Sequence, residues 1–220
     1  MMKLQLFKVA ANMRFFVTTV LVLLLTGCAV GNTYNYRSSD IAIPVEGEGS
    51  VGLAVVDRRP YVLSGDKPAA FIGLQRGGFG NPFTVTTESG RPLAEEVQTA
   101  LANGLRERGY KVLELYPSSS NDPDIKNAVQ AASIQKNVVL VLREWKTDAM
   151  MSFGLSYDLL LNVLTLDGDI LASSSVKGEK ENLGSAGFEE ANSNLARRAM
   201  ESKIEALFRD ETVRKALQSG

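Results

Sequence analysis

Cys28 is the residue in this sequence with the clearest capacity for chemistry. It is the only cysteine among 220 residues, and the sequence contains no histidine. A cysteine thiolate is a strong nucleophile that can become covalently modified, whereas a single cysteine cannot form an internal disulfide. The absence of histidine excludes Ser-His-Asp and Cys-His catalysis, as well as zinc sites with histidine ligands.

The residues before Cys28 have the zones of a secretory signal peptide. The basic residues of this segment are Lys3, Lys8 and Arg14, and they are followed by an uncharged apolar run from Phe15 to Leu25 and then by small residues. We therefore expect residues 1–27 to be a signal peptide that is cleaved between Gly27 and Cys28.

The four residues Leu25-Thr26-Gly27-Cys28 resemble the lipobox of bacterial lipoproteins. The resemblance implies that the Cys28 sulfur receives a diacylglyceryl group and that its new amino group carries a fatty acyl chain such as palmitate. Stable anchoring needs about two chains, because each buried CH₂ contributes roughly 0.8 kcal/mol. Ala29, in place of an aspartate, resembles the lipoproteins that are sorted to the outer membrane.

Two other interpretations of the segment compete with a lipoprotein signal. The first is an uncleaved transmembrane helix, but residues 15–30 would span only about 24 Å of a hydrocarbon core that is about 30 Å thick. The second is an ordinary buried helix with Cys28 in the core. Both would leave the cysteine without a lipid.

The charge of the chain argues against nucleic acid as a partner. The whole chain has a net charge of −1, and removal of residues 1–27 leaves 21 basic and 25 acidic side chains. A phosphate backbone requires a basic face, which an acidic body does not supply. The hydrophobic content of 45% is enough for a domain with a real core.

The glycine-rich stretch Gly73 to Gly80 is the next candidate for a site. It lacks the Gly-Lys-Ser/Thr of a phosphate-binding loop, and Pro82 follows where a helix would have to begin. We expect a mobile surface loop or, alternatively, a partner-docking loop in which Phe79 and Phe83 are exposed aromatic anchors. The pair Arg58-Arg59 is expected in a solvated turn, and the sequence predicts no cofactor and no metal site.

The pattern of apolar residues predicts three regions: the signal peptide (1–27), a lipidated tether (28–49, with 41–45 as an edge strand) and a single α+β domain (50–220). Strands are expected at 50–56, 110–115, 138–145, 155–166 and 169–180, and helices at 91–108, 122–135 and 189–208. Asp167-Gly168 predicts a two-residue hairpin turn between the last two strands. The fold class is thus a mixed β-sheet with two or three helices packed on one face, in the order β-α-β-α-β-β-β-α.

This pattern is similar to the YajG-type family of bacterial lipoproteins. The resemblance rests on VGLAVVDRRP, RPLAEEVQTALANGLRERGYKV, NVVLVLREWK, LTLDGDI and FEEANSNLARRAMESKIEALFRDETVRKAL, and it covers roughly residues 50–217. It implies an α+β domain on a lipid anchor and no known reaction.

We therefore expect a lipid-anchored protein of the bacterial cell envelope, on the periplasmic face of the outer membrane, that acts as a non-enzymatic structural or binding domain. Its partners would be the membrane, through the lipid, and an envelope protein. One alternative is an auxiliary subunit of an envelope transport or assembly machine. Another is an envelope hydrolase that uses carboxylates or a Ser-Lys pair, for which Ser173 to Ser175 are candidates.

Overall fold

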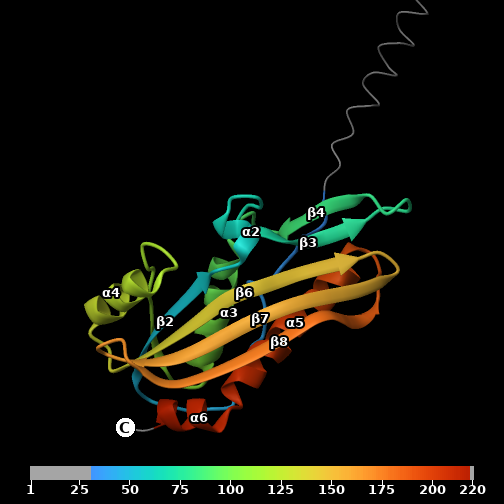
Figure 1. The fold of residues 1–220 in the computed structure, drawn as a ribbon. Helices are drawn as coiled ribbons and strands as arrows, with labels where there is room; N and C mark the ends of the chain where they lie inside the picture. The colour runs from blue at the N-terminus through green and yellow to red at the C-terminus, as the bar shows by residue number, and fades with distance from the viewer. Residues whose placement is uncertain (1–30, 219–220) are drawn as a thin grey trace, which may run out of the picture. The chain divides into compact units, whose positions relative to one another are not determined.

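The computed structural model describes residues 31–218, which are built around an eight-stranded mixed sheet (Figure 1). The strands are β1 (Thr33–Tyr34), β2 (Ser50–Asp57), β3 (Phe71–Arg76), β4 (Pro82–Thr87), β5 (Lys111–Glu114), β6 (Lys136–Ala149), β7 (Ser152–Thr165) and β8 (Ile170–Ser185). The helices are α2 (Pro60–Leu63), α3 (Leu93–Glu107), α4 (Asp122–Ala132), α5 (Glu189–Phe208) and α6 (Glu211–Gln218). No helix within residues 31–218 is long and apolar enough to cross a bilayer.

The long strand β6 organises the sheet. Its first part pairs in parallel with β2, and its last residues, Thr147 to Ala149, pair in parallel with β3. Along its whole length β6 also pairs antiparallel with β7, which in turn pairs with β8. β4 and β1 extend the sheet beyond β3, and β5 extends it beyond β2. The predicted α+β class with a mixed sheet is confirmed.

Helices cover both faces of the sheet. The main core joins one face of β2 and β6 to α3, α5 and α6, and it includes Leu53, Leu140 and Ile204. A smaller cluster on the opposite face holds α4, through Ile125 and Val129. Two of the predicted helices, α3 and α5, therefore share one face, together with α6. The predicted helix at 122–135 is α4, and it packs against the other face, which the sequence pattern did not indicate.

The helices α3 and α4 show how local sequence sets the element boundaries. The apolar stripe of α3 is buried, and Gly109, with φ of +92°, lies just past its end, as expected of a C-terminal glycine. α4 begins at Asp122, but its cap is the preceding residue: the Asn121 side chain accepts a hydrogen bond of 2.8 Å from the Asp124 backbone N–H.

The predicted tether needs correction, because its described part belongs to the folded unit. We call residues 31–49 the strap. Its side chains at Ile41, Ile43 and Val45 are buried, while the residues between them are exposed. This alternation is typical of an extended segment with one face on a core. Apart from β1 the strap pairs with no strand of the described chain, so the predicted edge strand at 41–45 is wrong.

Carboxylates take the place of a partner strand for the strap. The backbone N–H groups of Tyr36, Asp40 and Ala42 donate to the side chains of Glu96 on α3 and of Glu201 and Glu205 on α5, at 2.8–3.2 Å. Gly104 of α3 lies so close that an added Cβ would be 2.4 Å from the Ile41 carbonyl oxygen. The strap is therefore held between these two helices and has little freedom to act as a spacer.

Tyr36 connects the strap to the sheet, and its loss should be measurable. Its buried hydroxyl accepts a hydrogen bond of 2.9 Å from the indole N–H of Trp145, which is also fully buried. Tyr36→Phe leaves that N–H without an acceptor, so we expect a loss of about 1–3 kcal/mol in the free energy of unfolding. Denaturant titration in detergent measures it. Tyr116→Phe, at an exposed position, is the control, and an equal effect of both changes would contradict this role.

The glycine-rich segment is also different from the prediction, because it forms the β3–β4 hairpin and not a mobile loop. Gly73 and Leu74 pair with Thr147 and Asp148 of β6, as well as with β4. Gly73 allows this close approach: a Cβ there would stand 2.1 Å from the Thr147 hydroxyl oxygen and 2.3 Å from its carbonyl oxygen.

Gly73→Ala is accordingly expected to destabilise the domain. The added methyl group must displace backbone atoms of β6, and overpacking of this kind costs about 1–3 kcal/mol. Gly78→Ala is the matched control, because a Cβ at Gly78 meets no atom within 4 Å, and it should change stability by less than about 0.5 kcal/mol. Equal unfolding midpoints for the two variants would contradict the pairing of β3 with β6.

Arg59 is a further correction, since it is buried and not in a solvated turn. Its guanidinium binds both carboxylate oxygens of Asp57, at 2.9 and 2.6 Å, and donates to the carbonyl oxygens of Ala69, Phe71 and Trp145. Arg58, in contrast, lies near the surface and pairs with Asp122. Arg59 therefore ties the loop after β2 to the start of β3 and to β6.

Candidate functional site

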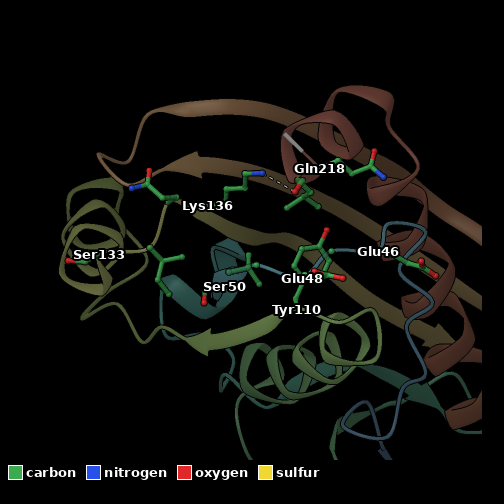
Figure 2. A pocket seen from close by; sticks show the side chains of 13 residues that line it. Glu46, Glu48, Ser50, Tyr110, Ser133, Lys136 and Gln218 are labelled. Carbon is green, nitrogen blue, oxygen red and sulfur yellow. Dashed lines mark hydrogen bonds between the residues drawn. The ribbon is translucent and has the colours of Figure 1, made fainter. Parts of the chain in front are cut away.

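A pocket of about 660 Å³ opens where β2 and β6 begin (Figure 2). Four regions of the chain line it: the end of the strap, Tyr110 between α3 and β5, the loop that joins α4 to β6, and the end of α6. The apolar part of the lining includes Val51, Ile134 and Leu217. Its volume lies within the range of about 300–1,000 Å³ typical of small-molecule sites.

The polar groups of the pocket are few. The Lys136 ammonium donates a hydrogen bond of 3.0 Å to the Leu217 carbonyl oxygen, drawn dashed in Figure 2. Burial lowers the pKa of Lys136 from its ordinary value. The Tyr110 hydroxyl is buried and has no hydrogen-bond partner among the described residues. The pocket thus suits a mostly apolar group that carries an acceptor for Lys136 or Tyr110.

Other groups that could do chemistry do not converge on this pocket. Ser173 of β8 donates to the Asn162 side chain, and the nearby Lys177 pairs with Asp158 at 3.4 Å, so the strand serines are not joined to a lysine. Within residues 31–218, no group of three or more Cys, Asp or Glu side chains could hold a metal ion. Among the described residues that line the pocket, no nucleophile and base are in contact.

Of the residues predicted to form a site, Gly27 and Cys28 lie outside the described residues. Phe79 and Phe83 are described, but they do not form one loop. Phe79 is fully exposed at the tip of the β3–β4 hairpin, whereas Phe83 is half-buried within β4, opposite Gln75. Phe79 is therefore exposed, as predicted, whereas the prediction that Phe83 is exposed in the same loop is wrong.

The sequence did not point to three further exposed apolar residues at the hairpin's end of the domain. They are Met150 and Met151 in the β6–β7 turn and Phe188 before α5. Isolated apolar residues at turns have no periodicity, so only the arrangement of the strands shows that they lie near one another. The pocket was missed for the same reason, because its lining comes from four distant segments.

Comparison with known proteins leaves the family of this chain open. No family model matches the sequence, and no curated protein sequence matches it. Among solved structures, protein XCC0632 from Xanthomonas campestris is 11% identical with a TM-score of 0.45, and the match covers 84% of this chain and 92% of that one.

Two further solved structures are similar at the same low identity. Lipoprotein GNA1162 from Neisseria meningitidis is 12% identical with a TM-score of 0.28, over 73% of this chain and 99% of that one. The LpoB C-terminal domain from Salmonella enterica is 12% identical with a TM-score of 0.31, over 66% and 99%. At TM-scores under 0.5, these likenesses assign no function to this chain, and the YajG-type resemblance stays a prediction.

Proposed function

We propose that this protein is a lipoprotein of the bacterial cell envelope, anchored through Cys28 and acting by binding and not by catalysis. The observation that carries the proposal is the sequence Leu25-Thr26-Gly27-Cys28 directly after an apolar segment with a basic start. The anchor would be stable, because two or three acyl chains meet or exceed the roughly two chains that stable attachment needs. The YajG-type resemblance and sorting to the outer membrane are part of the same proposal.

The short distance between the cysteine and the folded unit supports this proposal. Only Ala29 and Val30 separate Cys28 from Gly31, where the compact unit begins. An extended chain advances at most about 3.6 Å per residue, so Cys28 lies within about 11 Å of Gly31. A lipid on Cys28 would hold the domain directly at the bilayer surface.

The pocket lies at the other end of the sheet from this start. Lys136, in the pocket, is the first residue of β6, and Ala149 is the last. The thirteen residue-to-residue steps of β6, at about 3.3 Å each, place the pocket roughly 43 Å from the end where Gly31 lies. An anchored domain would thus present the pocket away from the membrane, toward a partner in the envelope.

Phase separation of the mature protein in Triton X-114 tests the anchored state. The acyl chains on Cys28 would carry the mature protein into the detergent phase. Recovery of the mature protein in the aqueous phase would contradict the proposal.

Crosslinking from the pocket tests the binding role. A photo-reactive amino acid at Gln135, an exposed residue of the pocket lining, should form one discrete adduct with an envelope protein in living cells. The absence of any adduct from Gln135 would argue against the pocket as the binding site.

The alternative role, a subunit of a larger envelope assembly, is favoured by β8. This strand has sixteen residues and pairs only with β7 within the described chain, so its outer edge is open to another strand. The same photo-reactive group at Glu179, an exposed residue of β8, would then form a crosslink either to a second copy of this protein, with twice the protein's mass, or to another protein whose strand pairs with β8.

A further inference from the structure

Four exposed apolar side chains gather at one end of the domain, and we call them the apolar rim: Phe79, Met150, Met151 and Phe188. Phe79 is fully exposed, Phe188 is 93% exposed and Met151 is 85% exposed. They come from three separate connections, namely the β3–β4 hairpin tip, the β6–β7 turn and the junction of β8 with α5. Large apolar groups exposed together usually mark an interaction surface.

The pairing of the strands places the three connections at the same end, as Figure 1 shows. β3 and β6 run parallel with Gln75 opposite Ala149. The hairpin tip comes directly after β3 and the β6–β7 turn directly after β6, so both lie at the same end of the sheet. The Ala186 N–H donates to the Met151 carbonyl oxygen at 3.1 Å, which brings the start of α5 beside the same turn. The rim is therefore a property of the folded sheet.

The folded unit also begins at this end. The Thr33 N–H donates to the Glu189 carboxylate at 2.6 Å, directly after Phe188. Gly31 lies against the hairpin, because a Cβ on it would be 1.8 Å from the Thr84 carbonyl oxygen. β1 runs parallel to β4, away from the hairpin tip, so Gly31, the first described residue, lies on the side of the rim.

We propose that the apolar rim inserts into the interfacial layer of the bilayer that holds the lipid on Cys28. This inference rests on the proposed lipid attachment, which puts the anchor within about 11 Å of Gly31. The bilayer is then the apolar phase within reach of all three connections. The free energy falls when aromatic and methionine side chains leave water for such a layer.

Charged neighbours set the depth of insertion. Arg76 pairs with Asp148 at 2.6 Å beside the hairpin tip, and Glu189 and Glu190 follow Phe188. Charged side chains are costly in the hydrocarbon core, so these groups remain among the headgroups while the rim side chains reach the boundary with the acyl chains. The rim would thus orient the domain, with the pocket pointing away from the membrane.

Single-cysteine probes on the lipidated full chain test the rim. Since Cys28 is the only cysteine and its thiol carries the lipid, a cysteine at Phe79→Cys or Phe188→Cys provides one free thiol for a fluorescent label. Ile170→Cys is the matched control, because Ile170 is 64% exposed at the start of β8, at the other end of the sheet. The labelled proteins are reconstituted in phosphatidylethanolamine–phosphatidylglycerol vesicles without any other protein.

Labels at positions 79 and 188 should be quenched by spin-labelled lipids, and their quenching by aqueous iodide should be roughly threefold or more weaker than at position 170, since interfacial side chains lie about 5–10 Å below the surface. Flotation of the same vesicles reports the anchor separately. Protein that floats with the vesicles but shows equal iodide quenching at all three positions overturns the rim and leaves the anchor intact. Protein that does not float overturns both.

Discussion

Cys28→Ser is expected to abolish lipid attachment. A serine hydroxyl has a far higher pKa than a thiol and is not the nucleophile that the lipid transfer requires. In cells fed an alkyne-tagged fatty acid, the wild-type protein should carry the tag and the variant should carry none. The variant should also keep residues 1–27, because cleavage before Cys28 follows lipidation in the lipoprotein class that the lipobox resembles.

Gly27→Ala is the control for this experiment. Alanine is an accepted residue before the cysteine of a lipobox, so this variant should be tagged and cleaved like the wild type. A Cys28→Ser protein that still incorporates the fatty acid would show that the lipid is attached elsewhere or that the signal has been misinterpreted.

Arg59→Met is expected to destabilise the domain strongly. The substitution leaves the Asp57 carboxylate without its partner and removes the donor to the Ala69, Phe71 and Trp145 carbonyl oxygens. Burial alone would lower the pKa of Arg59, but Asp57 and Tyr61 together outweigh burial and raise it, so the guanidinium stays charged. Removing one member of a buried pair costs about 3–5 kcal/mol.

Trp145 is a convenient probe of this effect, because it is the only tryptophan and is fully buried beside Arg59. Urea titrations followed by its fluorescence, in detergent, should show a midpoint lower by roughly 1–2 M. Arg58→Met is the control, since Arg58 pairs with the exposed Asp122 and should cost less than about 1 kcal/mol. Equal shifts for both variants would mean that the buried network contributes little.

The parts of the fold that the sequence predicted are those set by local pattern. The buried stripe of α3 repeats at helical spacing, and Gly168, with φ of +81°, makes the turn between β7 and β8 that Asp167-Gly168 indicated. In both cases the residues that decide the structure are close in the sequence.

The parts that were missed depend on distant residues. The strap looks polar and glycine-rich, but its N–H groups bind carboxylates that lie 60 to 163 positions away. In the sequence Arg59 has the pattern of a basic turn, but in the fold β3, the residue Ala69 before it, and β6 bring three carbonyl oxygens to its guanidinium. No short-range pattern encodes such partners, because any glutamate or any carbonyl oxygen could serve equally well.

The candidate sites divide in the same way. Cys28 can be recognised from four consecutive residues, since the processing enzymes would read an extended peptide before folding. The pocket and the apolar rim have no linear signature, because each is assembled from several connections of the sheet. The wrong pairing of Phe79 with Phe83 arose because a glycine-rich strand pair resembles a loop in sequence.

The most direct test of this account is the mass of the N-terminal peptide of the protein isolated from membranes. We predict a peptide that starts at Cys28, with a diacylglyceryl group on the sulfur and a fatty acyl group on the amino nitrogen. A peptide with a free Cys28 thiol, or one that still continues upstream into residues 1–27, would contradict the account.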